Sequence, residues 1–141
     1  MKFDDLIGKP YKEGARGPGA FDCWGLVLEV AARAGIELPD LAVPAGNKQR
    51  GELIALQKES NFVRLDGPQP CCLVLFRIID DENRIRWHVG FVLAGCGRFI
   101  HTTGKMGVNI SALDDPKWKL HIEGYYKYCR LPIADCRFTN E

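Results

Sequence analysis

The chain has 141 residues, 46% of them hydrophobic, with 19 basic and 18 acidic side chains that leave a net charge of +1. This length and apolar content predict a single domain, residues 1–141, with a core of its own. The balanced charge gives no electrostatic basis for binding nucleic acid, and no apolar run approaches the roughly 20 residues of a membrane-spanning helix. The N-terminus lacks an apolar stretch of the signal-peptide type, so we expect synthesis in the cytoplasm.

The cysteines do not indicate a disulfide framework or a metal site. A chain with enough apolar residues for a core does not need disulfide bonds, and no secretion signal suggests an oxidising compartment. Zinc sites use cysteine or histidine pairs at short spacing, and no C-x-x-C is present. We therefore predict no metal and no cofactor. The six cysteines are Cys23, Cys71, Cys72, Cys96, Cys129 and Cys136.

The first half of the chain is predicted to be helical, and its clearest helix begins at Cys23. Asp22 is a suitable N-cap, apolar residues recur behind it at helical spacing, and Gly35 is a suitable stop. The expected elements are a short helix over residues 2–7, a loop over 12–20, the helix from Cys23, a loop over 39–47 and a second helix over 49–58.

The second half is predicted to form strands. Residues 66–70, with two prolines and a glycine, mark a break before them. Helices followed by an antiparallel sheet predict an α+β domain. The expected strands cover residues 73–79, 85–93, 98–102, 107–110 and 124–130.

Cys23 is a candidate nucleophile because of its position. A thiol in the first turn of a helix feels the partial positive charge of the helix N-terminus, which favours the thiolate. The structural alternative is a buried cysteine that only fills space, which is the usual role of a free cysteine.

Two histidines strengthen the catalytic interpretation. Alternation in the strand over 85–93 places His88 on the face opposite Val89 and Phe91, and His101 lies in the next strand. Antiparallel neighbours joined by a tight turn can bring the two histidines together on one face. A thiol, a base and an orienting group form a Cys–His–polar triad, in which His88 takes the proton of Cys23 and His101 fixes the orientation of His88.

Three motifs, taken in order, resemble the NlpC/P60 family of cysteine peptidases. The family signature is a DC-small-G-hydrophobic helix start, an HVGI-like strand and a second histidine about a dozen residues on. These correspond to residues 22–27, 88–92 and 99–101. Trp24 and the segment 124–128 are similar to the phage tail-associated branch of the family.

The resemblance implies a papain-like fold with the nucleophile helix packed on a central antiparallel sheet. It implies hydrolysis of peptidoglycan stem peptides between γ-D-glutamate and the diamino acid. Tyr11 matches a tyrosine at the edge of the family's site, where its hydroxyl could join the backbone N–H of Cys23 in stabilising an oxyanion. The implied delivery to the cell wall is by a phage tail or a secretion machine, with tail proteins as possible partners.

Three residues are candidates for substrate binding: Tyr11, Asp22 and Trp24. Tyr11, Trp24 and the loop over residues 12–20 are expected to form one wall of a shallow groove past Cys23, while Arg16 or solvent meets the carboxylates of the stem peptide. Asp22 has two interpretations, a structural N-cap or a partner for a substrate amine. Trp24 also has an alternative place, in the core beneath the nucleophile helix.

The sequence departs from the family at two places. Trp24 stands where many relatives carry serine, and Cys71–Cys72 stands where the family usually shows Gly-Asp. Other functions also stay open, because a papain-like fold and a Cys–His pair serve amidases, acyltransferases and deamidating toxins. A tail assembly protein with a relic triad is a further alternative.

Overall fold

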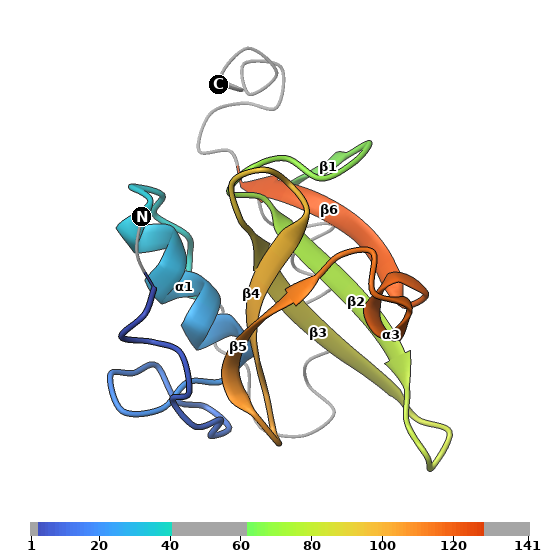
Figure 1. The fold of residues 1–141 in the computed structure, drawn as a ribbon, viewed down its shortest axis with the longest axis horizontal. Helices are drawn as coiled ribbons and strands as arrows, with labels where there is room; N and C mark the ends of the chain where they lie inside the picture. Colours follow the sequence, from blue (N-terminus) through green and yellow to red (C-terminus); the bar gives the residue numbers. More distant parts are fainter. Residues whose placement is uncertain (1–2, 41–61, 129–141) are drawn as a thin grey trace.

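A helix followed by a six-stranded antiparallel sheet forms the structure, a computed structural model that describes residues 3–40 and 62–128 (Figure 1). This confirms the predicted α+β class. The second helix, expected over residues 49–58, lies outside the described residues. The elements are α1 (Cys23–Arg33), β1 (Phe62–Leu65), β2 (Leu73–Ile79), β3 (Ile85–Val92), β4 (Arg98–Thr103), β5 (Gly107–Ala112), α3 (Pro116–Lys119) and β6 (Ile122–Tyr128).

Helix α1 has well-defined signals at both ends. At its start the carboxylate of Asp22 accepts a hydrogen bond from the backbone N–H of Gly25 at 2.6 Å. At its end Gly35 adopts a left-handed conformation with φ +80°. The N–H groups of Gly35 and Ile36 then reach back to the carbonyls of Ala32 and Ala31, which is a Schellman motif. The predicted start and stop of this helix are confirmed.

The sheet has the strand order β1-β6-β2-β3-β4-β5. Strands β2 and β3 form a hairpin that is paired along its whole length, from Leu73↔Phe91 to Ile79↔Ile85. By contrast, β3 and β4 pair only at Phe91↔Ile100 and Val92↔Phe99. The residues of β3 before Phe91, His88 among them, are therefore not paired with β4.

Both faces of the sheet are buried. On one face, α1 contributes Leu26, Val27 and Val30, which have no exposed surface and pack with residues such as Leu75 and Phe91. Burying each such side chain stabilises the fold by about 1.5–3 kcal/mol. On the other face lies a second buried cluster, against which Trp118 of α3 packs. Its members are Cys72, Val74, Phe76, Val92, Phe99 and Leu113. Burial on two faces explains why β2 begins with the continuous apolar run Leu73–Phe76.

Some expected elements differ from the structure. The short helix predicted over residues 2–7 is a turn over 4–8, in which the carbonyl of Phe3 accepts from the N–H groups of Leu6 and Ile7 before Gly8 takes a φ of +88°. Two elements were not predicted from the sequence: β1, a four-residue strand paired with β6, and the one-turn helix α3. In the described parts of the chain, no helix is long and apolar enough to span a membrane.

Candidate active site

The half-buried thiol of Cys23 lies at the first residue of α1. Its position follows from the loop before it, where the N–H of Lys12 donates to the carbonyl of Phe21 and the N–H of Asp22 donates to the carbonyl of Ala15. These bonds hold the chain against the helix start. The N–H groups of a first helical turn point out of the helix, so the thiol lies at the positive end of the α1 dipole.

His88 meets Cys23 directly. The Nδ1 atom of His88 lies 3.1 Å from the Sγ atom of Cys23, a hydrogen-bonding distance for a thiol and an imidazole. The two residues are 65 positions apart in the sequence, and the packing of α1 against β3 and β4 brings them together. The site therefore joins the helix to the stretch of β3 that β4 leaves unpaired.

The contacts continue beyond His88 into the sheet. The Nε2 atom of His88 lies 2.8 Å from Nδ1 of His101, and Nε2 of His101 lies 2.9 Å from Oγ of Ser111. The hydroxyl of Ser111 donates to Oδ1 of Asn109 at 3.2 Å. The amide nitrogen of Asn109 is held by the carbonyl of Gly107 at 2.7 Å. This is a line of hydrogen bonds from β3 through β4 to β5.

One proton arrangement satisfies every contact in this line. Because the amide nitrogen of Asn109 donates to Gly107, its Oδ1 is the acceptor for Ser111, and the hydroxyl of Ser111 then accepts from Nε2–H of His101. Nδ1 of His101 accepts in turn from Nε2–H of His88, which leaves Nδ1 of His88 as the acceptor for the thiol. The geometry thus selects the tautomer in which His88 can take the proton of Cys23.

Aromatic rings enclose the two histidines. Trp118 stacks on His88 with the ring centroids 5.6 Å apart and meets His101 edge-on at 4.7 Å. Phe76 and Phe99 pack against the other sides of this pair. Burial lowers the pKa of His88 to about 4. Burial, together with the neighbouring His88, lowers the pKa of His101 to about 3, so both imidazoles are neutral near pH 7.

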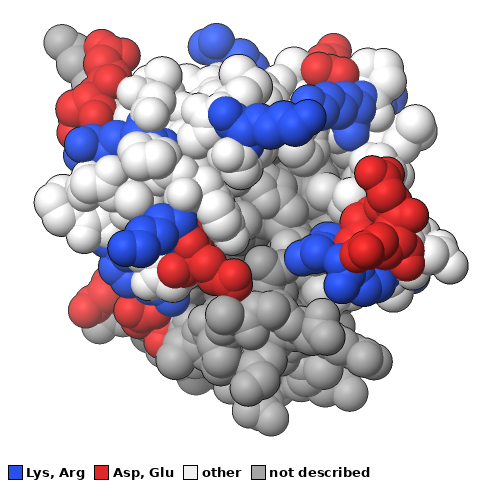
Figure 2. All heavy atoms as spheres, turned by 90° about the horizontal axis from the view of Figure 1, so that it is seen from below, with Lys and Arg blue, Asp and Glu red and all other residues white. Residues whose placement is uncertain are grey.

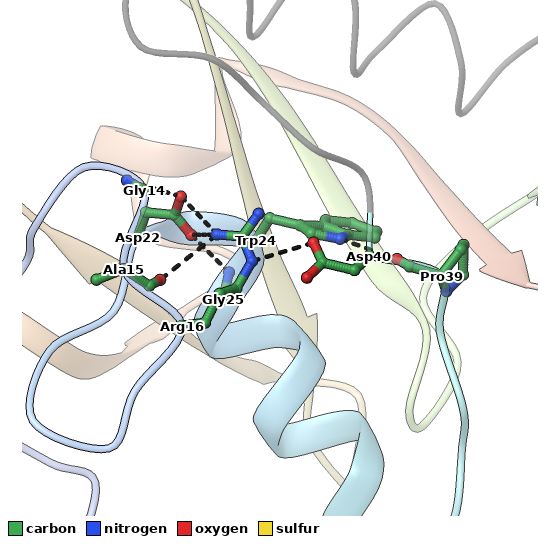
Figure 3. Close-up of polar contacts among 8 residues, drawn as sticks. All are labelled: Gly14, Ala15, Arg16, Asp22, Trp24, Gly25, Pro39 and Asp40. Atoms are coloured by element: carbon green, nitrogen blue, oxygen red, sulfur yellow. Dashed lines mark hydrogen bonds and ion pairs between the residues drawn. The ribbon is translucent and has the colours of Figure 1, made fainter.

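The carboxylate of Asp22 is fully occupied by groups of the protein (Figure 3). One oxygen accepts from the N–H of Gly25 and the other from the N–H of Gly14, at 2.6 and 3.1 Å. Nη1 of Arg16 lies 2.7 and 2.8 Å from the two oxygens, while Nε of Arg16 donates to Asp40 at 3.1 Å. Of the two interpretations of Asp22, these contacts support the structural one.

Trp24 lies in the core and not on the wall of a groove. It is 2% exposed, packs edge-on against Phe62 and donates its indole N–H to the carbonyl of Pro39 at 3.0 Å. A large ring on the inner face of α1 removes more apolar surface from water there than it could beside a substrate. Arg16, expected to meet substrate carboxylates, is engaged by Asp22 and Asp40 instead. Tyr11 is half-buried and its backbone pairs with Phe21, close to the nucleophile along the chain.

Three residues that surround the histidines were not predicted from the sequence: Asn109, Ser111 and Trp118. Alternation along residues 107–112 places Asn109 and Ser111 on one face, and Asn109 is the partner of His101 in the β4–β5 register. That alternation could have suggested both residues. No local signal pointed to Trp118, because its contact with His88 depends on where α3 folds back.

The charge distribution and the thiols add little to the site. Figure 2 shows Lys and Arg interspersed with Asp and Glu over the described part of one face, without a continuous field of one sign. Among residues 3–40 and 62–128, no three side chains are grouped so that they could hold a metal ion. Cys71, Cys72 and Cys96 are free thiols, whereas Cys129 and Cys136 lie outside the described residues.

A thiol at a helix start, within hydrogen-bonding distance of a histidine on an antiparallel sheet, is the arrangement that an activated cysteine nucleophile requires. A model of the NlpC/P60 family matches residues 8–127, and the chain belongs to this family. Its members are generally cysteine peptidases or amidases that act on peptidoglycan.

Solved structures of this family are similar to the chain over 89% of its length. One, from Staphylococcus aureus, is described as similar to lipoprotein, NLP/P60 family, with 26% identity and a TM-score of 0.58. An NlpC/P60 family protein from Bacillus cereus has 24% identity and a TM-score of 0.60, and NlpC1 from Trichomonas vaginalis has 19% and 0.63. The chain spans 38%, 39% and 41% of these proteins, respectively. No curated protein matched the sequence.

Proposed function

We propose that the chain is a cysteine peptidase that hydrolyses peptidoglycan stem peptides at the bond between γ-D-glutamate and the diamino acid. Cys23 is the nucleophile, His88 the general base and His101 the orienting group. The observation that carries the proposal is the 3.1 Å contact between the Cys23 thiol and Nδ1 of His88. Membership of the NlpC/P60 family supports the choice of substrate class.

In the first half of the reaction, His88 takes the proton of the Cys23 thiol, and the thiolate attacks the carbonyl carbon of the stem peptide. A C–S bond forms, the oxyanion collapses, and the C–N bond breaks as His88 returns its proton to the leaving amine. In the second half, water gives a proton to His88 and attacks the thioester. The C–S bond breaks, and the thiol forms again.

The hydrogen bonds behind His88 support this sequence. When His88 carries two protons, Nδ1–H donates to the thiolate and Nε2–H still donates to His101, so no partner has to turn. Groups that need no reorganisation during the reaction are the ones that lower its barrier. For the oxyanion we propose the backbone N–H of Cys23 in the first turn of α1, with the hydroxyl of Tyr11 as a second donor.

The test is hydrolysis of defined muropeptides by the purified chain, followed by mass spectrometry. We expect new termini at the γ-D-glutamyl bond, and we expect Cys23→Ala to lose at least about a thousandfold in rate, because the covalent step is removed. Casein is the comparison substrate. Turnover should be far lower on casein, since an ordinary L-peptide would place its carbonyl away from the thiolate.

Other products would decide against the assignment. Robust casein cleavage with intact muropeptides would indicate a general cysteine protease. Release of the stem peptide from its sugar would indicate an amidase, and loss of neither substrate would favour a non-catalytic role. Delivery to the wall by a phage tail or a secretion machine stays a prediction, supported by the similarity of Trp24 and residues 124–128 to the phage tail-associated branch.

A further inference from the structure

The residue before the proposed nucleophile is an acid. Asp22 is 8% exposed, so its carboxylate lies out of water directly beside Cys23 in the chain. A buried negative charge at the residue before Cys23 opposes the formation of a second negative charge on the sulfur of Cys23. A cysteine that has to act as a thiolate therefore needs this charge to be cancelled.

Arg16 supplies the opposite charge. Its Nη1 atom contacts both oxygens of Asp22, at 2.7 and 2.8 Å, and its side chain is 28% exposed. The contact to Asp40 on the far side of the guanidinium, at 3.1 Å, holds Arg16 from a second direction (Figure 3). Since Asp40 is more than half exposed, solvent screens its charge far more than that of Asp22.

We propose that Arg16 is a positioning residue for Cys23: it cancels the charge of Asp22, the residue next to Cys23 in the chain, and ties the loop before α1 to the start of the helix. This inference rests on the proposed role of Cys23 as the nucleophile. In this role Arg16 contacts neither the Cys23 thiol nor the substrate, and it acts through Asp22.

Charged and titratable groups approach Cys23 from several elements besides its own. His88 of β3 contacts the thiol, and His101 of β4 lies behind His88. Both imidazoles are neutral above about pH 4, because burial lowers the pKa of each. Lys117 of α3 lies over the Trp118 ring, with its Nζ atom 5.5 Å from the ring centroid. Among the formal charges, that of Asp22 lies nearest to Cys23 along the chain, and Arg16 is its ion-pair partner.

A purely structural role for the Arg16–Asp22 pair gives a different expectation. If the pair only fastened the loop, removal of either partner would loosen the helix start and change the reactivity of Cys23 in the same direction. If the pair acts through charge, the two removals have opposite effects. Asn at position 22 keeps an oxygen for the N–H of Gly25, so Asp22→Asn changes the charge while it preserves the cap.

The experiment measures the rate at which iodoacetamide alkylates Cys23 of the full chain as a function of pH, with mass spectrometry of the peptide. We expect Arg16→Gln to move the midpoint of the pH curve to a higher pH. At pH values below that midpoint, alkylation should be slower than in the wild type by about three- to tenfold. Asp22→Asn should move the midpoint downward. The double variant Arg16→Gln/Asp22→Asn, in which the pair is removed as a whole, should return close to the wild type.

Asp40→Asn is the matched control, because it removes the other partner of Arg16 and leaves the contact to Asp22. Its midpoint should equal that of the wild type. Far-UV circular dichroism and the slow labelling of the buried Cys72 thiol report whether each variant is folded. If Arg16→Gln alone does not fold, a downward shift in Asp22→Asn and a return to the wild-type midpoint in the double variant still decide, because the difference between those two variants gives the effect of Arg16→Gln.

Midpoints that move the same way in Arg16→Gln and Asp22→Asn, or an Arg16→Gln variant that matches Asp40→Asn, would overturn the inference. Because alkylation needs no substrate, the result does not depend on peptidase activity. A chain that cleaves no muropeptide but shows the opposite shifts would refute the proposed function and leave the role of Arg16 intact.

Discussion

The histidine behind His88 makes this site different from a triad with a carboxylate. In the proposed mechanism, a carboxylate would neutralise the imidazolium that forms on His88, whereas His101 is neutral and offers only a lone pair. The imidazolium must therefore draw its stabilisation from the thiolate beside it and from the hydrogen-bond line through Ser111 to Asn109. His101 serves for orientation, and its orientation in turn depends on β5.

This arrangement predicts a ranking of variants at position 101. His101→Ala removes the acceptor for Nε2–H of His88 and should lower kcat/KM by about a hundredfold or more, since a misoriented base costs about 2–3 kcal/mol. His101→Asn or His101→Gln keeps a polar acceptor and should retain more activity. Ser111→Ala should cost less still, because it acts one bond further from the base. The kinetics of muropeptide cleavage measure all four variants. A His101→Ala variant with the kcat/KM of the wild type would remove His101 from the mechanism.

At the level of elements, the contact between the loop and α1 decides where the Cys23 thiol lies. Gly25 is a buried residue in the first turn of α1, and a Cβ atom there would collide with the carbonyl oxygen of Ala15. It would also come within 3.0 Å of the Asp22 carboxylate and 3.2 Å of the Cα atom of Arg16. Glycine at this position lets the loop lie directly on the helix start.

We therefore predict that Gly25→Ala destabilises the protein by about 2 kcal/mol or more, because backbone and not a flexible side chain would have to move. Gly19→Ala is the matched control in the loop before α1, since Gly19 is exposed and its Cβ would meet nothing within 4 Å. It should change the free energy of unfolding by less than about 0.5 kcal/mol. Urea unfolding followed by tryptophan fluorescence measures both, and equal midpoints would contradict the close approach.

At the scale of the whole molecule, folding buries two imidazoles that are protonated more readily in the unfolded chain. The folded-state pKa values, about 4 for His88 and about 3 for His101, lie below the ordinary value of 6.5. Between those values the unfolded chain binds more protons than the folded one. The free energy of unfolding must therefore fall as the pH falls from about 6.5 toward 4.

The predicted loss over this window is several kcal/mol, because each pH unit in which a histidine is protonated only in the unfolded chain costs about 1.4 kcal/mol, and it should largely vanish in the double variant His88→Asn/His101→Asn. Other groups, such as the carboxyl of Asp80, whose pKa is lowered to about 2 by its hydrogen bonds, titrate alike in both proteins. The difference in the pH dependence of the unfolding free energy between the wild type and the double variant therefore gives the contribution of the two histidines. Parallel curves of unfolding free energy against pH would contradict the burial of the pair.

Much of this architecture could be predicted from local patterns. Asp22 and Gly35 predicted the limits of α1, because capping depends on a few consecutive residues. Alternation predicted the strands that carry His88 and His101. The turn over residues 4–8 and the strand β1 were not predicted, since each is too short for its period to stand out.

The sequence by itself determined the chemical groups of the site: a thiol at a helix start, two histidines on adjacent strands, and the family motif that joins them. Only the tertiary structure decided what surrounds those groups. Trp24 faces the core, Trp118 covers His88, Ser111 extends the hydrogen bonds and Arg16 pairs with Asp22. The physical reason is that periodicity and capping report on neighbours along the chain. The partner of a buried ring or charge is chosen by packing between elements, which in this site joins residues as far apart as Cys23 and His88.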